Sequence, residues 1–371
     1  MSKTLQDYAT LINDTIQSNE INHYITTDNM CQNLGGIDTF KNINIPQGKV
    51  RSFQKDDVLL SNIRLYFRKV YRAKQKGGCS SDVLVFRAKR IDSATLFAIL
   101  SSQIFTDYAC SGSQGSKMPR GNKTHMMNFK IPTINFTIAK IFNSIQNKIE
   151  NNHKINELLH KILELLYEQY FVRFDFLDEN NKPYQTSGGK MKFSKELNRL
   201  ISNDFEVKTL GELTQLKVGN KNANHSSNQG KYPFFTCSNN PLRCETYQFE
   251  GKHIIISGNG NFYVTHYDGK FDAYQRTYVV NPNNPNHYVL IYLFVKSYTN
   301  YLKLQSRGSI IKFITKSDIE NIKIILPNLK TYAKWNNVLK MIENNNQSTQ
   351  TLTALRDFLL PLLLKQQVKP Q

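Results

Sequence analysis

The residues most suggestive of chemistry form a glycine-rich turn, IIISGNGNF, at positions 254–262. A strand that runs into such a turn often cradles a phosphate or lies against a nucleotide cofactor, because glycine lets the backbone approach a ligand closely. The spaced glycines alone are a weak signal, and no strand–helix alternation of the dinucleotide-binding kind surrounds them. The turn therefore fits either a cofactor loop or a tight turn with another purpose.

Other catalytic motifs are weak. An amino-methyltransferase needs an Asn/Asp-Pro-Pro-aromatic loop, and the nearest segment, NNPNHY at 283–288, has one proline and an extra residue before its tyrosine. A nuclease would pair an acidic residue with Glu-x-Lys, and EVK at 206–208 has no convincing partner. No P-loop, HExxH motif or plausible Ser-His-Asp or Cys-His pairing occurs. The sequence predicts no catalytic residue and no cofactor.

Metal-ligating residues show no recognisable spacing either. The five cysteines are scattered, odd in number and never form a CxxC pair, so neither a disulfide framework nor a zinc site is indicated. Cys237 and Cys244 with nearby His253 could be grouped as a metal cluster, but ordinary buried thiols are the preferred interpretation. The sequence predicts no metal site.

Charge is the first positive indication of function. The chain has 371 residues, with 48 Lys and Arg against 29 Asp and Glu, for a formal net charge of +19. Such a surplus favours a polyanionic partner, with nucleic acid first and an anionic membrane second. A polar N-terminus and the lack of any 18-residue apolar run argue against a membrane partner and predict an intracellular, cytoplasmic protein.

Two segments concentrate the positive charge. Residues 61–90 are rich in Lys and Arg, have Asp82 as their one acidic residue, and carry interspersed aromatic residues that offer stacking surface. Residues 111–130 form a glycine-containing basic stretch without acidic residues, which fits a flexible phosphate-contacting loop. A solvated basic face is the alternative for each. The DNA-contacting residues predicted here are Asn62, Arg64, Tyr66, Arg68, Lys69, Lys117, Arg120 and Lys123.

The second half of the chain is less basic and richer in amides and aromatic residues. Asn and Gln side chains pair with the adenine edge, and Ser or Thr with several bases. For each residue alone a turn-forming or core role is the more ordinary explanation, but some of the group should contact bases. The candidates are Ser238, Asn239, Asn240, Asn259, Asn261, Tyr274, Gln275 and Arg276.

These candidates belong to a chain that repeats itself. GSKMPRGNKTHMMNFKI at 115–131 and GSIIKFITKSDIENIKI at 308–324 share residues at a constant offset of 193 positions, and the same offset relates IENN at 149–152 to IENN at 342–345. DDVLLSN at 56–62 also resembles KHIIISGN at 252–259. Each half therefore reads as a strand-rich segment, a proline and a long helix.

The predicted helices carry a narrow apolar seam. After Pro132 and Pro327, apolar residues recur in steps of three and four, which is typical of a coiled coil. Asn152 and its equivalent Asn345 fall on the seam, where a polar residue often fixes helix register; two exposed asparagines are the alternative. The seam residues are Ile138, Phe142, Ile145, Ile149, Ile155, Leu159, Ile162 and Leu166, then Trp335, Val338, Ile342, Leu352, Leu355, Leu359 and Leu363.

Short apolar runs bounded by turn residues predict strands at 56–63, 81–88, 252–257 and 275–281. Between the halves, residues 178–204 are polar and rich in turn formers, and they read as a connector with one short helix near residues 194–200. The fold class expected is α+β.

Together these features resemble the DNA-specificity subunit of type I restriction–modification systems. HYITTDNM, KVRSFQKDDVLLSNIRLYFRKVYRA and GGCSSDVLVFRA look like a first target-recognition domain of that family, and YPFFTCSNN, YQFEGKHIIISGNGNF and YDGKFDAYQRTYVV like a second. The resemblance covers essentially the whole chain. It divides the chain into a first recognition domain (1–133), a first spacer helix (134–173), a connector (174–207), a second recognition domain (208–328) and a second spacer helix (329–371).

The resemblance implies two β-rich recognition domains separated by two long antiparallel coiled-coil helices, with pseudo-twofold symmetry. Each domain would read one half of a bipartite, asymmetric double-stranded DNA target, and the helices would set the unread spacer. It also implies two modification (methyltransferase) subunits as partners, joined by motor-nuclease restriction subunits, in a prokaryotic cytoplasm. The subunit itself would do no chemistry and bind no cofactor.

Two other classes of function remain open from the sequence. One is a stand-alone DNA adenine methyltransferase with its own S-adenosylmethionine pocket, for which the catalytic loops are missing. The other is an RNA-binding or structural coiled-coil protein, which would show no sequence-dependent contact with DNA.

Overall fold

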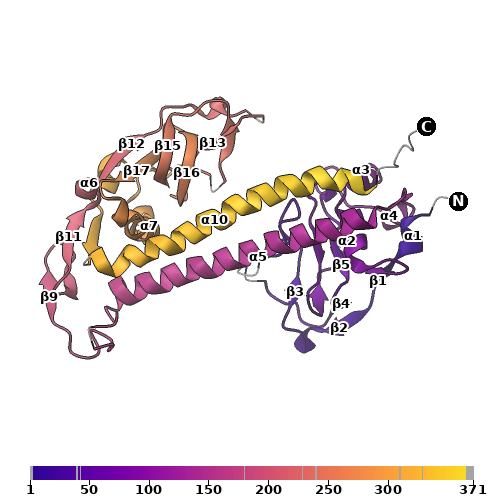
Figure 1. Ribbon diagram of the computed structural model, residues 1–371, viewed down its shortest axis with the longest axis horizontal. Helices are drawn as coiled ribbons and strands as arrows, with labels where there is room; N and C mark the ends of the chain where they lie inside the picture. Colours follow the sequence, from indigo (N-terminus) through magenta and orange to yellow (C-terminus); the bar gives the residue numbers. More distant parts are fainter. Residues whose placement is uncertain are drawn as a thin grey trace. The chain divides into compact units, whose positions relative to one another are not determined.

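The computed structural model describes residues 3–38, 41, 43–178, 180–227, 229–238, 240–308, 311–327 and 329–364. The chain divides into two compact units, one made of Met1–Ile155 with Asn344–Gln371 and the other of Asn156–Glu343. Both boundaries fall inside a long helix, either α5 (Phe136–Tyr167) or α10 (Leu329–Leu359), so each unit contains part of both (Figure 1). Each unit mixes helices and sheets, as expected.

The first unit contains two four-stranded sheets. One is fully antiparallel, in the order β1 (Ala9–Ile12), β8 (Val83–Ala88), β5 (Val58–Ser61), β6 (Val70–Arg72). The other has the order β2 (Thr15–Gln17), β4 (Lys49–Phe53), β7 (Gly77–Cys79), β3 (Tyr24–Ile25), with only β3 and β7 parallel. The strands predicted at 56–63 and 81–88 are confirmed as β5 and β8.

Strand β5 is buried on both faces because alternate side chains enter different cores. Val58 and Leu60 join the larger cluster, whereas Leu59 joins a smaller one. The larger core also takes residues from β1, β6, β8, α5 and several shorter helices. The shorter helices of this unit are α1 (Leu5–Tyr8), η1 (Ser18–Glu20), η2 (Leu65–Phe67), α2 (Ser93–Ser101), α3 (Gln103–Ser111), α4 (Lys123–Met127) and η6 (Leu360–Leu363).

The second unit is built on a six-stranded sheet. Its order is β12 (Thr214–Val218), β17 (Thr277–Pro282), β15 (Phe249–Ser257), β16 (Val264–Ala273), β13 (Tyr232–Phe235), β14 (Leu242–Cys244). Only β13 and β16 run parallel. Strands β15 and β17 confirm the predictions at 252–257 and 275–281. As in β5, alternate residues of β15 enter different cores: Ile254 and Ile256 one, Ile255 the other.

Helices of the second unit include α7 (Tyr288–Ser297), which packs against β16 and β17. The others are η3 (Glu168–Val172), α6 (Leu210–Leu213), η4 (Ala223–His225), η5 (Pro285–His287), α8 (Thr299–Gln305) and α9 (Lys316–Glu320). Two strand pairs complete the unit: β11 (Glu206–Thr209) with β18 (Lys323–Leu326), and β9 (Met191–Ser194) with β10 (Arg199–Ser202). The short helix predicted near residues 194–200 is wrong, because this segment is the β9–β10 hairpin.

Helices α5 and α10 pack against one another within each unit. In the first unit Asn152 Nδ2 donates to the Asn345 carbonyl oxygen (3.4 Å) and to Thr349 Oγ1 (3.1 Å). In the second, Asn156 Nδ2 donates to the Ile342 carbonyl oxygen (3.4 Å). Asn152 is 1% exposed, so its amide lies inside the helix contact.

The buried stripe of these helices differs in part from the predicted seam. Phe142, Ile145, Ile149 and Leu159 are buried as predicted. Ile155, Ile162 and Leu355 are exposed, and the prediction was wrong for them. Polar residues take part in the contact instead, since Arg356 Nη1 donates to Gln146 Oε1 at 3.2 Å and both side chains are buried. A strictly apolar seam could not anticipate these positions. The buried residues that the predicted seam did not include are Gln146, Asn156, Leu163 and Arg356.

Among the described residues, none of the helices combines the length and apolar character that crossing a membrane requires.

Candidate nucleic-acid interface

The two basic segments of the first unit, far apart in sequence, lie side by side. Ile63 and Arg120 form an antiparallel bridge, and the Arg64 backbone N–H donates to the Pro119 carbonyl oxygen at 2.9 Å. The Gly121 N–H donates to the Asn62 carbonyl oxygen at 3.1 Å. A turn of residues 62–68 is therefore bonded to a loop of residues 114–120. We call this arrangement the first turn–loop pair.

The outer surface of the first turn–loop pair is basic and aromatic. Tyr66 is 53% exposed, with its ring edge-to-face against Phe67. Lys117 and Lys123 are exposed. Arg120 is exposed too, but its Nη2 lies 3.0 Å from Asp82 Oδ1, so part of its charge is already neutralised. Exposed lysines beside an aromatic ring suit contact with a phosphate backbone.

Three of the predicted contacts in this segment point inward instead. Asn62 is buried, and within the described part of the chain its Oδ1 has no hydrogen-bond partner. Arg68 Nη2 donates to the Ser101 carbonyl oxygen at 2.9 Å, and burial lowers the pKa of its guanidinium. Lys69 Nζ donates to the Thr27 carbonyl oxygen, and burial lowers its pKa as well. These positions favour structural roles for the three residues.

Arg64 lies between these extremes. It is half-buried, its φ of 49° is in the left-handed region, and its Nη2 donates to the Lys117 carbonyl oxygen at 3.4 Å. Arg68, at the other end of η2, has the same φ. Left-handed backbone at a residue with a Cβ costs about 1–2 kcal/mol and is concentrated at functional sites. The left-handed conformations of Arg64 and Arg68 set the shape of the turn that carries Tyr66.

The second unit repeats this arrangement with other side chains. Asn259 and Phe313 form an antiparallel β-bridge. Beside it, the Gly260 N–H donates to the Lys312 carbonyl oxygen (2.9 Å), and the Ile314 N–H donates to the Gly258 carbonyl oxygen (3.0 Å). The loop also closes in the same way: Gln114 and Arg120 exchange backbone hydrogen bonds of 2.9 and 2.8 Å, and the residues 193 positions later, Arg307 and Phe313, exchange bonds of 3.0 and 2.8 Å. This is the second turn–loop pair.

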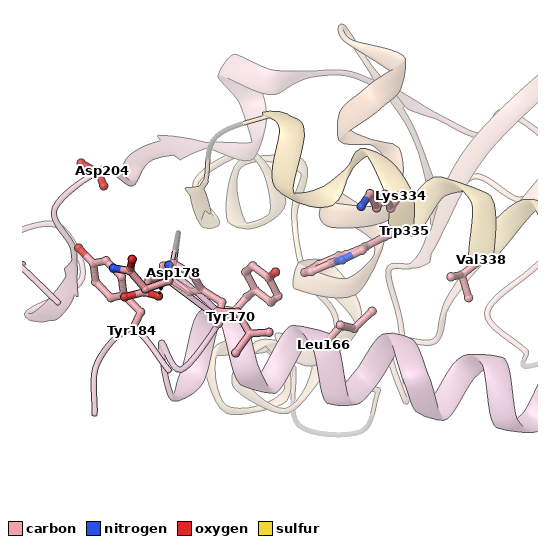
Figure 2. A pocket seen from close by; sticks show the side chains of 11 residues that line it. Leu166, Tyr170, Asp178, Tyr184, Asp204, Lys334, Trp335 and Val338 are labelled. Carbon is pink, nitrogen blue, oxygen red and sulfur yellow. Dashed lines mark hydrogen bonds between the residues drawn. The ribbon is translucent and has the colours of Figure 1, made fainter. Parts of the chain in front are cut away.

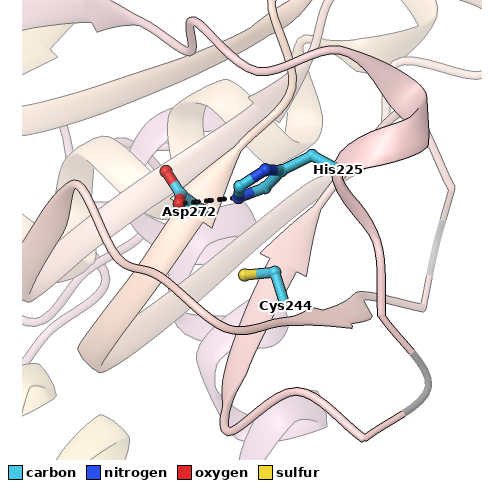
Figure 3. A group of neighbouring side chains, drawn as sticks. All are labelled: His225, Cys244 and Asp272. Carbon is cyan, nitrogen blue, oxygen red and sulfur yellow. Dashed lines mark hydrogen bonds and ion pairs between the residues drawn. The ribbon is translucent and has the colours of Figure 1, made fainter.

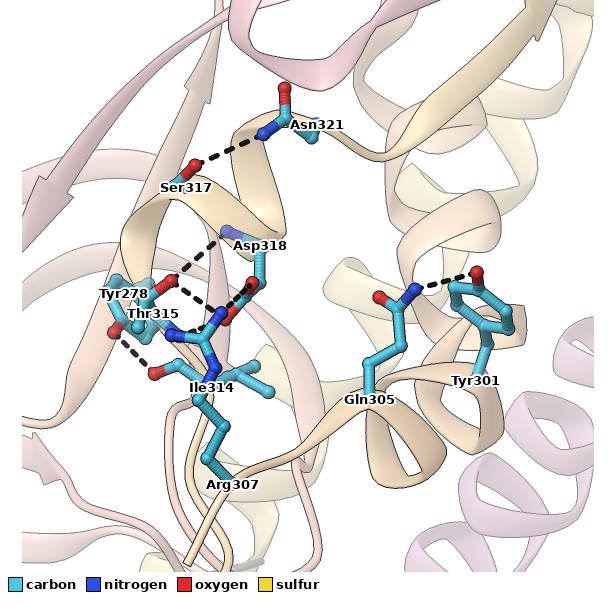
Figure 4. Close-up of polar contacts among 9 residues, drawn as sticks. All are labelled: Tyr278, Tyr301, Gln305, Arg307, Ile314, Thr315, Ser317, Asp318 and Asn321. Carbon is cyan, nitrogen blue, oxygen red and sulfur yellow. Dashed lines mark hydrogen bonds and ion pairs between the residues drawn. The ribbon is translucent and has the colours of Figure 1, made fainter. Parts of the chain in front are cut away.

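Polar contacts hold the base of the second loop (Figure 4). Arg307 Nη2 lies 3.3 Å from Asp318 Oδ1, and Asp318 Oδ2 accepts hydrogen bonds from the backbone N–H and hydroxyl of Thr315, both at 2.7 Å. Tyr278 Oη donates to the Ile314 carbonyl oxygen at 2.8 Å from within the core. The start of α9 therefore anchors the loop that ends beside it.

Four predicted base-contacting residues converge on one pocket beside the second turn–loop pair. The pocket has a volume of about 480 Å³ and brings together residues from five segments of the chain. Within the described part of the chain, Asn259 Oδ1 is buried without a hydrogen-bond partner, whereas Asn261 Nδ2 donates to Tyr263 Oη at 3.0 Å. We call it the amide pocket. Its lining residues are Ala223, Thr236, Cys237, Ser238, Asn259, Gly260, Asn261, Tyr274 and Ile311.

The remaining predicted residues of the second unit do not line the amide pocket. Asn240, Gln275 and Arg276 are exposed. The Arg276 carbonyl oxygen accepts from the Gly258 N–H at 2.7 Å, so its backbone holds the glycine turn. Asn239 lies outside the residues that the structure describes.

The glycine-rich turn is explained without a cofactor. It joins β15 to β16 in an antiparallel hairpin, so no helix N-terminus follows it to hold a phosphate. A Cβ at Gly258 would lie 2.5 Å from the Arg276 carbonyl oxygen, and Gly260 has a φ of +72°. Close backbone approach and left-handed geometry therefore require the two glycines. The NNPNHY segment is equally structural, because Asn284 Oδ1 caps η5 by accepting from the Asn286 N–H.

The sequence-based prediction did not include several residues of this surface. Ile311 is 62% exposed and lines the amide pocket, and Thr236 and Cys237 form part of its wall. The 193-residue offset was the available signal, since it maps the basic loop of residues 114–120 onto residues 307–313.

A separate hollow of about 760 Å³ lies in the second unit beside α5 and α10 (Figure 2). Its lining is aromatic and acidic, including Tyr170, Tyr184, Trp335 and the carboxyl groups of Asp178 and Asp204. The Trp335 ring stands edge-to-face on Tyr170 at 5.1 Å between centroids. Because carboxylates repel phosphates, this hollow is a poor candidate for nucleic-acid contact.

Comparison with known proteins agrees with this geometry. Residues 202–355 match the type I restriction modification DNA specificity domain. The chain is 38% identical over 129 residues to the type I restriction enzyme EcoDI specificity subunit of Escherichia coli, an alignment that covers 33% of this chain and 28% of that relative. It is 24% identical over 301 residues to the MjaIX specificity subunit of Methanocaldococcus jannaschii, covering 72% of this chain and 67% of the relative.

A solved structure supports the same fold. The S subunit of a type I restriction–modification system from M. genitalium aligns with a TM-score of 0.63 at 16% identity, over 99% of this chain and 96% of that one. At this identity the similarity is evidence for the fold alone. The domain match covers residues 202–355, less than half of the chain, and the relatives that the chain matches are specificity subunits of type I restriction enzymes.

Proposed function

We propose that this chain is a non-catalytic subunit that recognises a bipartite, asymmetric DNA target. The observation that carries the proposal is the turn–loop pair, which both units form with the same backbone hydrogen bonds and different exposed side chains. One scaffold used twice with different side chains suits the reading of two different half-sites. Residues 1–133 and 208–328 are the proposed recognition domains, with 174–207 as the connector.

Contacts within each domain divide between backbone and bases. Lys117 and Arg120 on the first turn–loop pair, with Lys123 at the start of α4, are the proposed phosphate contacts, which position the domain without reading sequence. In the second unit, the amide pocket presents Ser238, Asn259 and other groups that hydrogen-bond base edges. Arg64 and Tyr66 complete the proposed surface of the first domain.

The long helices are the proposed spacer, as residues 134–173 and 329–371. We propose that they pair as an antiparallel coiled coil related by a pseudo-twofold axis, with Asn152 and Asn345 fixing register. In support, Asn152 donates to the Asn345 carbonyl oxygen from a buried position. A polar group inside such a seam penalises slipped registers, which would leave it without a partner.

The proposed partners follow from the resemblance to type I specificity subunits. The chain would recruit two modification subunits, which carry out adenine methylation, and motor-nuclease restriction subunits, in a prokaryotic cytoplasm. A stand-alone methyltransferase is disfavoured, because the glycine-rich turn is a β-hairpin and the NNPNHY segment caps a helix. These were the two segments on which an S-adenosylmethionine site would have rested.

The proposal is tested by expressing the chain with the modification subunits of its own system and mapping methylated adenines across a genome. A bipartite methylated motif that disappears when the chain is omitted is the expected result. Stoichiometric binding of S-adenosylmethionine by the purified chain alone would instead support the methyltransferase. Absence of any sequence-dependent methylation or DNA protection from the assembled complex would overturn DNA recognition.

Replacing Lys117 and Lys123 with glutamine is expected to weaken DNA binding by the complex and to reduce its dependence on salt. Each phosphate contact releases condensed counterions, so the slope of log K against log salt should fall by roughly one per lost contact. Binding isotherms at several salt concentrations measure the slope. The methylated motif should stay unchanged, because phosphate contacts carry no sequence information.

Two control variants accompany this measurement. Lys49→Gln removes an exposed charge on β4 outside both basic segments, and the slope should not change. Arg68→Gln should lower the free energy of unfolding by about 1–3 kcal/mol, because it removes the donor to the carbonyl of Ser101 at the C-terminal end of α2. If Lys49→Gln changed the slope as much as the double variant, the first loop would not be the phosphate contact.

A further inference from the structure

Three potential metal ligands that the sequence keeps apart meet at one edge of the six-stranded sheet (Figure 3). His225 ends η4, Cys244 ends β14 and Asp272 lies near the end of β16. Their ligand atoms all lie within 4.8 Å of one another. Strand β13 brings two of them together, because it pairs with β14 on one side and with β16 on the other.

Asp272 is the unusual member of this cluster. Its side chain is 0% exposed, and within the described part of the chain its Oδ1 has no hydrogen-bond partner. Its Oδ2 accepts from Thr246 Oγ1 at 2.6 Å and lies 3.2 Å from His225 Nε2. Buried carboxylates are normally paired with a cation or bound to a metal. Among the described residues, histidine is the only ion-pair partner of Asp272, and it is charged only when protonated.

The spacing of the histidine and the carboxylate is compatible with a metal ion. Zinc binds imidazole nitrogen and carboxylate oxygen at about 2.0–2.2 Å and thiolate sulfur at about 2.3 Å. In a tetrahedral site this places the nitrogen and oxygen ligands about 3.3 Å apart, close to the observed 3.2 Å between His225 Nε2 and Asp272 Oδ2. Cys244 is fully buried, and its Sγ lies 3.2 Å from the Thr246 carbonyl oxygen, so the thiol is held beside the other ligands.

We propose that His225, Cys244 and Asp272 form a binding site for a borderline-soft divalent cation of the zinc type, with a solvent molecule as fourth ligand. Mixed nitrogen, sulfur and oxygen donors suit zinc better than calcium or magnesium, which prefer oxygen alone.

The site would stiffen the wall of the amide pocket. Ala223, two residues before His225, lines that pocket. The loop that carries Ala223 and His225 is already hydrogen-bonded near its start, since the Gln275 N–H donates to the Lys221 carbonyl oxygen at 2.9 Å. A metal bridging His225 to β14 and β16 would fix the loop at a second point. This role adds to the proposed reading of DNA, but the site itself does not depend on it.

The test is a zinc titration of the full-length, chelator-treated chain, with elemental analysis after gel filtration. The expected result is one equivalent of zinc per chain, and cobalt should give a thiolate-to-metal charge-transfer band. Cys244→Ser should abolish the band and weaken zinc binding at least tenfold. Cys110→Ser is the control, because that cysteine lies outside the cluster and does not line the amide pocket, and it should behave like the unaltered chain.

His225→Gln provides a second variant should the buried Cys244→Ser chain fail to fold, because His225 is partly exposed at the end of a short turn. It should also weaken zinc binding at least tenfold while circular dichroism stays unchanged. Failure of the unaltered chain to bind zinc overturns the proposal, as does equal binding by the His225→Gln chain. Neither outcome bears on DNA recognition, which the methylome reports independently.

Discussion

Asn259→Ala is expected to relax the DNA sequence recognised by the second unit at one or two adjacent base pairs. The Asn259 amide lines the amide pocket, and within the described part of the chain its Oδ1 is buried without a partner. An amide held in this way by a rigid hairpin can pair with a base edge. A bidentate contact of this kind contributes about 1–3 kcal/mol to discrimination, a preference of roughly 5- to 150-fold.

Methylome sequencing of cells that express the variant with its modification subunits measures this change. The half-site read by the first unit should be retained, because none of its predicted contacts is altered. Asn259→Asp sharpens the test: it keeps the size of the side chain but replaces the amide donor with an acceptor, which favours cytosine N4 over adenine. The preferred base should then shift rather than become degenerate.

Asn240→Ala is the matched control, since Asn240 is an exposed asparagine of the same unit that does not line the amide pocket. The DNA motif methylated by the complex with the Asn240→Ala variant should stay the same. An unchanged motif in both Asn259 variants, with normal folding, would place base reading elsewhere in the second unit.

The local parts of the fold were predictable because their signals are local. Strands β5, β8, β15 and β17 follow from short apolar runs between turn residues. The β9–β10 hairpin was mistaken for a helix because Lys195–Leu197 supply helix-compatible residues in a four-residue turn. A single short segment gives little periodicity from which to distinguish the two.

The helix contact shows a second limit. Leu355 was expected in the seam, but it is exposed, and the neighbouring Arg356 is buried against Gln146. Hydrophobicity favours the leucine at that position. A buried arginine needs partners for its charge and its N–H groups. Asp357 is adjacent in sequence, but Gln146 lies 210 residues away. No pattern within one helix reveals such a pairing.

The sites were predictable only as sets of residue types. Basic and amide-rich segments were found from composition, yet their convergence depends on bridges such as Ile63 to Arg120 and Asn259 to Phe313. The proposed metal site was missed for the same reason. Cys244 was grouped with Cys237 and His253, which are nearer in sequence, whereas the neighbours of its thiol are His225 and Asp272. Strand pairing, not spacing, brings them together.

Inserting four residues into both long helices is expected to lengthen the unread spacer of the target without changing either half-site. The insertions belong after Ile155 in α5 and after Glu343 in α10, where the two units meet in sequence. Four residues extend a helix by about 6 Å, and with about 3.4 Å per base pair this corresponds to roughly one to two base pairs. Methylome mapping measures spacer and half-sites together.

Both helices must receive the same insertion, because hydrogen bonds join them on both sides of the insertion positions. Asn152 donates to Asn345 and Thr349, while Asn156 donates to Ile342. An insertion in α5 alone cannot keep both sets of hydrogen bonds in register, so it should reduce methylation of every site. A matched seven-residue insertion restores the seam to nearly the same helix face and should be tolerated best. Altered half-sites with an unchanged spacer would contradict the proposed ruler, because the length of the helices would then have no bearing on the separation of the two recognised sequences.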